Sequence, residues 1–153
     1  MALNRKRLRL VGLDYSEPGA YFVTVCTANR QDLLGEIADG QTKLSSRGEV
    51  AKASWNGIPN HFPGVALDAF VIMPNHIHGI LLFTHDVGAG HARPLPTVVG
   101  SFKSAASRHI GAPIWQRSYW ERVIRNEAEL NRIRTYIEEN PLRWPTDPEN
   151  LRR

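Results

Sequence analysis

The sequence predicts an α+β fold, in which an antiparallel sheet carries helices packed on one face. Short segments rich in β-branched and aromatic residues alternate with segments of helical periodicity. Tight turns separate neighbouring strand segments, which favours antiparallel pairing. The length of 153 residues and the hydrophobic fraction of 42% fit one globular domain that buries its own core.

The first half of the chain begins with strand signals. Residues 21–27 (YFVTVCT) are dense in β-branched and aromatic side chains, so we expect a central strand there. Residues 33–44 alternate around Asp39 and Gly40, a residue pair typical of a two-residue hairpin turn. A strand followed by a hairpin is therefore predicted.

A helix and two further strands follow. Ser46 and Glu49 form a capping-box pattern, which predicts a helix that begins at Ser46 and ends near residues 57–59. Residues 65–73 and 76–84 are apolar runs separated by a Pro-Asn turn. These two runs are predicted to be strands joined directly by that turn.

The last third contains two helices and a strand-like segment. Residues 97–109 have apolar side chains at helical spacing, and residues 114–124 resemble a strand. Asn126 and Glu129 form a second capping-box pattern, which opens a helix that we expect Pro141 to end.

The order of these elements is strand, hairpin, helix, strand, strand, helix, strand, helix. A ferredoxin-like arrangement is the simplest topology consistent with it. We expect a single domain over residues 1–153, with a basic N-terminal arm at residues 1–10 and a short C-terminal tail at residues 141–153.

Charge and cysteine content narrow the classes of function. The formal net charge of +4 favours a polyanionic partner such as a nucleic acid. Cys26 is the only cysteine, which excludes an intramolecular disulfide and a cysteine-rich zinc module and favours a reducing, cytoplasmic setting. The longest apolar run, residues 80–83, is too short to span a bilayer, so no membrane role is predicted.

The tripeptide His76-Ile77-His78 opens one of the apolar strands. Alternate side chains of a strand face the same way, so both imidazoles are expected on one face, about 7 Å apart along the chain. Two neutral imidazoles without thiolates suit a divalent ion such as Mg²⁺ or Mn²⁺ with open positions for phosphate oxygens. The alternative is that both rings are structural and hydrogen-bonded to neighbouring strands.

Tyr136 lies at the edge of the apolar stripe of the last predicted helix, and Asn140 follows one turn later on the same side. A phenol is almost fully protonated at neutral pH and is a weak nucleophile, which a metal-neutralised phosphate would remedy. Asn140 could supply a carboxamide oxygen to the same metal. The alternative is a boundary aromatic with a packed ring and a solvated hydroxyl.

Two surfaces are candidates for contact with nucleic acid. Lys103, Ser104 and Arg108 lie on the outer face of the helix at residues 97–109, where cations suit phosphates. Arg117 belongs to an aromatic and basic run that could stack unpaired bases. A solvated helix face and a core strand are the respective alternatives.

Five ordered blocks carry a resemblance to a known family across residues 8–144. They are LRLVGLDYSEPGAYFVTVCT (8–27), LDAFVIMPNHIHGILL (67–82), VVGSFKSAASR (98–108), WQRSYWERVIR (115–125) and IRTYIEENPLRW (133–144). The chain resembles the single-tyrosine HUH transposases, in particular the REP-associated tyrosine transposases. Two departures are visible, because Arg122 stands where this family more often has His, and Trp120 where Tyr or His is more usual.

The resemblance implies a ferredoxin-like DNA transposase. His76 and His78 would bind a divalent metal, Mg²⁺ or Mn²⁺, and Tyr136 would attack the scissile phosphate of single-stranded DNA beside a palindromic hairpin. Asn140 matches the position at which related enzymes carry a Gln ligand. The product would be a 5′-phosphotyrosyl link with a free 3′-hydroxyl, formed in the bacterial cytoplasm at the nucleoid.

Two other classes of function remain open in the sequence. One is a hairpin-specific DNA-binding protein without turnover. The other is a phosphodiesterase in which water attacks and Tyr136 packs. Whether the protein acts as a monomer or as a homodimer also stays open.

Overall fold

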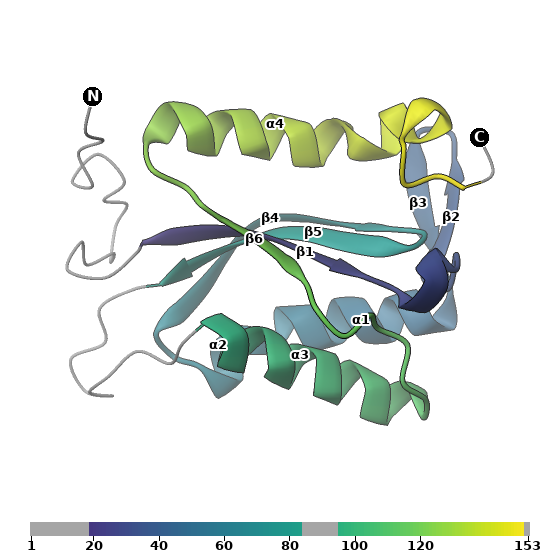
Figure 1. The fold of residues 1–153 in the computed structure, drawn as a ribbon, viewed down its shortest axis with the longest axis horizontal. Coiled ribbons are helices and arrows are strands. Elements are labelled where there is room, and N and C mark those ends of the chain that lie inside the picture. The colour runs from purple at the N-terminus through teal and green to yellow at the C-terminus, as the bar shows by residue number, and fades with distance from the viewer. Residues whose placement is uncertain (1–18, 84–94, 152–153) are drawn as a thin grey trace.

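A computed structural model describes residues 19–83 and 95–151, so the predicted basic arm at residues 1–10 lies outside the described part of the chain. Its main sheet has the strand order β4-β5-β1-β6, and every pairing is antiparallel (Figure 1). The strands are β1 (Ala20–Cys26), β4 (Val65–Met73), β5 (His76–Phe83) and β6 (Trp120–Val123). The α+β class and the central position of β1 are confirmed.

The predicted hairpin is a separate two-stranded sheet of β2 (Gly35–Ala38) and β3 (Gln41–Leu44). Its two turn residues, Asp39 and Gly40, have φ angles of 53° and 73°. Positive φ at both central positions is the geometry of the type I′ turn that Asp-Gly favours. The residue pair therefore fixed the hairpin as expected.

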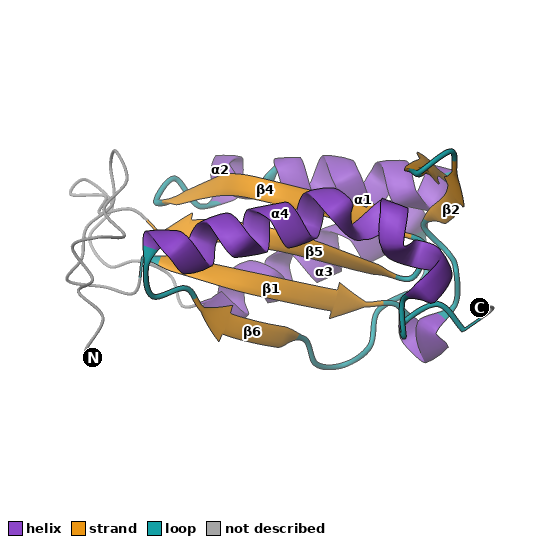
Figure 2. Ribbon diagram, turned by 90° about the horizontal axis from the view of Figure 1, so that it is seen from above, coloured by secondary structure: helices purple, strands orange, loops and turns teal. Residues whose placement is uncertain are grey.

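The helices cover both faces of the main sheet, so the prediction that they pack on one face is wrong. Helices α1 (Ser46–Asn56), α2 (Ile58–His61) and α3 (Leu95–Ile110) lie below the sheet in Figure 1, and α4 (Glu127–Arg143) lies above it. Figure 2 shows the molecule from above, with α4 in front of the sheet and β6 at one edge of the sheet. Short 3₁₀ turns, η2 (Ala28–Arg30) and η4 (Trp144–Thr146), complete the described elements.

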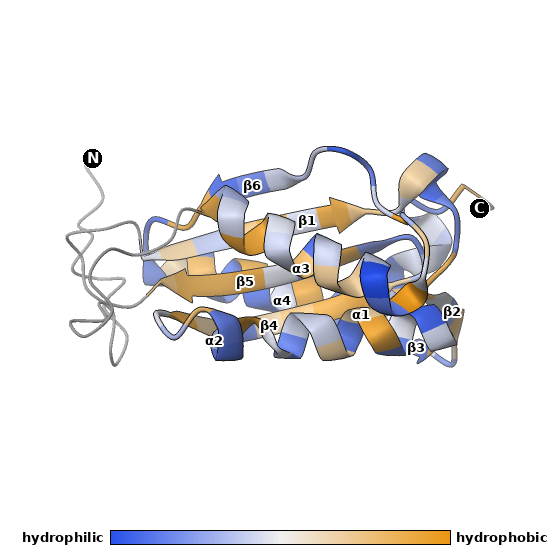
Figure 3. Ribbon diagram, turned by 90° about the horizontal axis from the view of Figure 1, so that it is seen from below, coloured by the Kyte–Doolittle hydropathy of each residue, from blue (hydrophilic) through white to orange (hydrophobic). Residues whose placement is uncertain are grey.

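The burial of β5 explains the two helical layers. Every residue of β5 is buried. Ile77 and Leu81 belong to the core between the sheet and helices α1 and α3, whereas Ile80 and Leu82 belong to the core between the sheet and α4. A strand that is apolar on both faces needs cover on both faces. The hydrophobic colour along β1 and β5 contrasts with the hydrophilic β6 in Figure 3.

Several predicted boundaries shift. The N-cap of α1 is Ser45, whose Oγ accepts a hydrogen bond from the Gly48 amide at 3.1 Å, and not Ser46. The predicted strand at residues 114–124 is reduced to β6, preceded by a single bridge between Thr27 and Trp115.

Helix α4 begins as predicted, because Asn126 Oδ1 accepts a hydrogen bond from the Glu129 amide at 2.8 Å. Pro141 does not end it, and the helix continues to Arg143. A proline in the last turn removes one hydrogen bond but leaves few residues beyond it to disrupt. The predicted tail therefore starts inside α4, and Trp144 after it is buried.

Replacing Gly79 by alanine is expected to destabilise the fold, because a Cβ atom there would overlap the Trp55 indole in the lower core. Overpacking of this kind costs about 1–3 kcal/mol. Urea unfolding measures the change. Gly100→Ala is the matched control, because a Cβ atom there meets nothing within 4 Å and alanine favours the helix. Equal stability of Gly79→Ala and the native chain would contradict this packing.

Candidate functional site

The two histidines of β5 lie side by side on the sheet face that α4 covers. In the register with β1, His76 is opposite Cys26 and His78 is opposite Thr24. Both histidines are buried, and their ring centroids are 4.5 Å apart. Ile77 between them is buried in the core on the other face. The alternation of the strand thus brings the imidazoles together as the spacing predicts.

A hydrogen bond from the preceding turn orients His76. Its Nδ1 lies 2.7 Å from Asn75 Oδ1, and the Asn75 amide nitrogen donates to the Glu149 carbonyl at 2.6 Å. Because Oδ1 can only accept, His76 Nδ1 carries the proton and Nε2 has a free lone pair. Nε2 is buried and has no hydrogen-bond partner. Such an atom is placed to bind a cation.

Asn140 on α4 presents a second unpartnered acceptor. Its Oδ1 is buried without a hydrogen-bond partner, and its Nδ2 donates to the Tyr136 carbonyl at 3.3 Å. Burial lowers the pKa of His76 to about 4, while Asp147 and the adjacent Asn140 side chain act in the opposite direction. His76 is therefore neutral at pH 7, and Asn140 lies close enough to affect it.

A residue of the neighbouring strand β1 orients His78. Thr24 Oγ1 lies 2.7 Å from His78 Nδ1, so the neighbouring strand fixes the orientation of this ring. Burial and then the neighbouring His76 lower the pKa of His78 well below its ordinary value. Both imidazoles are neutral at physiological pH, which is the protonation state that metal binding requires.

Helix α4 places Tyr136 beside these histidines. Its ring centroid is 5.4 Å from that of His78 and 6.2 Å from that of Phe22. The residue is 36% exposed, and the Arg143 guanidinium lies 5.3 Å from the ring centroid. The side chain thus combines a fixed ring with access from solvent and a neighbouring positive charge.

An ion pair anchors the helix that carries Tyr136. Arg134 on α4 donates to both carboxylate oxygens of Asp68 on β4, at 2.8 and 2.7 Å. The guanidinium lowers the pKa of Asp68. Two parallel hydrogen bonds between a guanidinium and a carboxylate fix the relative orientation of the two groups as well as their distance. It lies on the β4 side of α4, so Tyr136 is free to face β1.

The donors fit a divalent cation with an incomplete protein shell. Two imidazole nitrogens and one amide oxygen are borderline and hard ligands, which suit Mn²⁺ or Mg²⁺. The unpartnered His76 Nε2 and Asn140 Oδ1 are the atoms that such an ion would satisfy. Among residues 19–83 and 95–151, no cluster of three or more His, Cys, Asp or Glu side chains could hold a metal. Open coordination positions would remain for phosphate oxygens.

The predicted DNA-contact residues do not join this site. Helix α3 lies on the opposite face of the sheet from α4 (Figure 1), and it carries Ser104 and Arg108 as exposed residues. Lys103 on α3 donates to the carbonyls of Gln116 and Arg117, at 2.7 and 3.1 Å. Lys103 therefore fastens the segment before β6, and the Arg117 side chain is exposed beside it.

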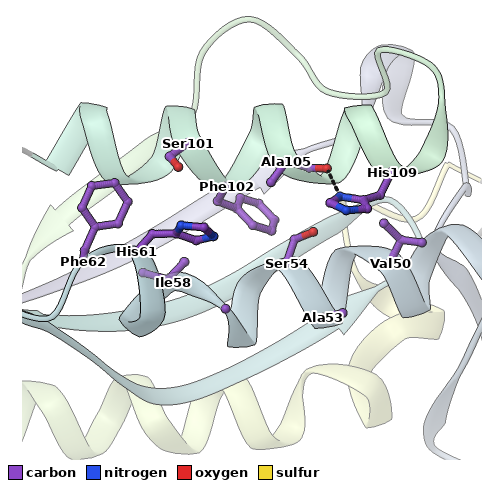
Figure 4. Close-up of a pocket in the computed structure, with 11 residues that line it drawn as sticks. Val50, Ala53, Ser54, Ile58, His61, Phe62, Ser101, Phe102, Ala105 and His109 are labelled. Carbon is purple, nitrogen blue, oxygen red and sulfur yellow. Dashed lines mark hydrogen bonds between the residues drawn. The ribbon is translucent and has the colours of Figure 1, made fainter.

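A pocket of about 320 Å³ lies between α3 and the α1–α2 pair (Figure 4). Its floor is apolar, with Ile58 and Phe102 among the lining residues. His61 and His109 face it, and His109 Nδ1 donates to the Ala105 carbonyl at 2.8 Å. Because α1 and α3 cover the lower face of the sheet, this pocket is remote from Tyr136.

Three residues that contact the site side chains were not predicted from the sequence to belong to it. Asn75 was interpreted as a turn residue, and its contact with His76 depends on the side-chain geometry of that turn. Thr24 is the polar residue between Phe22 and Cys26 on its strand face, which is a detectable signal. Arg143 lies two turns after Tyr136 on the same side of α4, so helical spacing could have identified it.

Lowering the pH from 6.5 to 4 is expected to destabilise the fold. His76 titrates near 6.5 when unfolded and near 4 when folded. In this window the unfolded state binds a proton that the folded state does not, so the free energy of unfolding falls as pH falls. The full shift corresponds to about 3 kcal/mol. Urea unfolding at several pH values should give a flatter profile for His76→Gln; identical slopes would contradict the assignment.

No helix in the described part of the chain is long and apolar enough to cross a membrane.

No protein-family model matches the chain. An uncharacterized protein of Haemophilus influenzae is 33% identical in an alignment of 165 positions, gaps included, that covers 94% of this chain and 92% of that protein. A "putative REP-associated tyrosine transposase" of the same organism is 23% identical, over 85% of this chain and 74% of its own length.

Two solved structures share the fold. One is described as a REP-associated tyrosine transposase bound to a REP hairpin; it has a TM-score of 0.66 and 22% identity, and the match covers 83% of this chain and 68% of that one. The other is a "putative transposase" from Deinococcus radiodurans, with a TM-score of 0.51 and 22% identity, covering 78% of this chain and 88% of that one. The similarity therefore extends over most of each chain.

Proposed function

We propose that this chain, which is similar to a putative REP-associated tyrosine transposase and shares its fold with a solved one, belongs to that family and nicks and rejoins single-stranded DNA beside hairpin-forming palindromic repeats. The observation that carries the proposal is the juxtaposition of Tyr136 with His78, next to the unpartnered acceptors of His76 and Asn140. A nucleophile and a cation-binding set are what phosphoryl transfer to a side chain needs. The hairpin named for the structural relative suggests the form of the substrate.

The chemical step belongs to Tyr136. Its Oη attacks the scissile phosphorus, the Oη–P bond forms, and the bond from phosphorus to the 3′ oxygen breaks. The phenol loses its proton to solvent, and the departing oxygen takes up a proton to become a free 3′-hydroxyl. The downstream DNA is then linked through its 5′ phosphate to Tyr136. Attack by another 3′-hydroxyl reverses the step and joins a new strand.

His76, His78 and Asn140 would hold the divalent cation, Mg²⁺ or Mn²⁺. When bound, the cation would neutralise charge on the non-bridging oxygens of the phosphate. Asn75 and Thr24 keep the imidazoles in their orientation. Partners of this kind tune metal affinity even though they do not touch the ion.

The side chains around Tyr136 prepare it for the attack. Phe22 and His78 contact its ring and limit its motion. The Arg143 guanidinium lies 5.3 Å from the centroid of the Tyr136 ring and also pairs with Glu139 at 2.8 Å, so the positive charge beside the phenol is shared with that carboxylate. Tyr136 thus approaches the phosphate from the helix, opposite the sheet that carries the histidines.

The test uses an oligonucleotide with an imperfect palindrome and single-stranded tails on both sides, called here the hairpin oligonucleotide. It is incubated with protein and Mn²⁺ and then run on a denaturing gel. Transfer of the 3′ label onto protein supports the proposal. Cleavage without an adduct indicates attack by water, and binding without cleavage indicates a DNA-binding protein without turnover; either outcome contradicts it.

A further inference from the structure

Trp120 stands on the same sheet face as the candidate site, one strand beyond it. In the antiparallel register Trp120 is opposite Thr24, and Thr24 is opposite His78. Directly opposed residues point to the same face of a sheet. His78, Thr24 and Trp120 therefore form one row across β5, β1 and β6. At a strand spacing of about 4.8 Å, Trp120 lies about 10 Å from His78 along that row.

The indole of Trp120 is not needed to fill a core. Trp55 and Trp144 are buried, whereas Trp120 is 73% exposed. Strand β6 is the edge of the sheet, and within the described residues no strand pairs with its outer side. Helix α4 does not extend over β6 when viewed from above (Figure 2). A large exposed aromatic on a sheet edge favours unwanted association, but a single exposed ring is common on protein surfaces, and it is the cation beside Trp120 that points to a ligand.

A cation lies in the next row on this face. Arg122 is opposite Phe22, whose ring contacts Tyr136. Its Nε lies 3.4 Å from Glu129 Oε1 on α4, while 65% of its side chain is exposed. Glu129 thus holds Arg122 between β6 and α4 without covering it. The half-buried Phe22 and Thr24 form the sheet surface between this cation, Trp120 and Tyr136.

An exposed aromatic ring beside a held guanidinium matches the chemistry of single-stranded DNA. Every nucleobase has a flat face that stacks on an indole, and the adjoining phosphate pairs with arginine. A double-stranded stem offers phosphates but not the flat faces of its bases. The occupant that fits this surface is therefore an unpaired nucleotide.

We infer that Trp120 is a stacking platform for an unpaired base next to the scissile phosphate, and that Arg122 contacts the phosphate of the same strand. This inference rests on the proposed function, since it places the strand that Tyr136 attacks. Trp120 and Arg122 are positioning residues in it. The strand would run over Thr24 and Phe22, between β6 and α4.

The test compares binding in the Tyr136→Phe background, where cleavage does not interfere. Trp120→Ala is expected to weaken binding of the hairpin oligonucleotide roughly five- to hundredfold, the range for losing one base–aromatic stack, and Trp120→Phe should restore most of it. Val123→Ala is the matched control, because Val123 lies on the same strand but opposite Tyr21, on the other sheet face. Fluorescence anisotropy at one fixed salt concentration measures the affinity, and circular dichroism checks folding.

The partner base is found by changing the DNA. Abasic positions are placed one at a time on each side of the scissile phosphate. One position should weaken binding as much as Trp120→Ala does, and combining the two changes should add little further loss. Additive losses at every position would overturn the inference.

Two other results would also overturn it. Equal affinity of Trp120→Ala and Val123→Ala would show that no base stacks there. Conversion of a dimer into a monomer by Trp120→Ala in analytical ultracentrifugation would show that the β6 edge is a protein interface. Binding that depends on Trp120, without any adduct from the native chain, would instead support the platform and contradict the proposed function.

Discussion

Tyr136→Phe is expected to abolish covalent attachment of DNA while leaving hairpin binding intact. The substitution removes one oxygen atom, the proposed nucleophile. The ring contacts with His78 and Phe22 remain, so the helix and the sheet keep their packing. The measurement is the fraction of 3′-labelled hairpin oligonucleotide that migrates with protein on a denaturing gel, together with the affinity in anisotropy.

Tyr119→Phe is the matched control for this change. The substitution also removes a hydroxyl, which in Tyr119 donates to Glu121 at 3.4 Å. The Tyr119 ring, however, packs against the core between the sheet and helices α1 and α3. The variant should form the adduct at the native rate. Cleavage by Tyr136→Phe at the rate of the native chain would show that Tyr136 merely packs.

Removal of either histidine has the second large effect. His76→Ala and His78→Ala are expected to lower Mn²⁺-dependent cleavage by more than about 100-fold, because loss of partners outside the ligand shell alone costs about 10–100-fold. Calorimetric titration of Mn²⁺ should show the matching loss of metal affinity. His109→Gln is the control, because His109 is exposed and belongs to α3, the helix on the other face of the sheet (Figure 1).

Asn75→Ala separates orientation from ligation. It removes the acceptor that holds His76 Nδ1 but leaves both imidazoles in place. Raised Mn²⁺ should therefore restore cleavage by Asn75→Ala and not by His78→Ala. Full metal affinity in either histidine variant would contradict the proposed ligand set.

The placement of the site depends on periodicities that the sequence displays. The period of two in a strand puts His76 and His78 on one face, and the helical period puts Tyr136 and Asn140 on one side of α4. The structure brings these four residues together. Local patterns could predict this much because each pair lies on a single element.

Contacts between elements were harder to anticipate. The prediction of helices on one face failed because β5 was interpreted by its strand propensity and not by its burial on both sides. Lys103, a candidate for DNA contact, donates to carbonyls of the segment before β6, a contact that only the tertiary fold creates. The row from His78 to Trp120 depends on strand order and register, which local patterns in the sequence do not reveal.

The central claim is that Tyr136 becomes linked to a 5′ phosphate. The most direct test is mass spectrometry of the tryptic digest after reaction of the native chain with the hairpin oligonucleotide. Trypsin releases residues 135–143, a peptide in which Tyr136 is the sole tyrosine. The proposal predicts a nucleotide mass on that peptide, attached through a 5′ phosphate, with a free 3′-hydroxyl on the upstream fragment. Cleaved DNA with that peptide unmodified, or the nucleotide mass on another peptide, would contradict it.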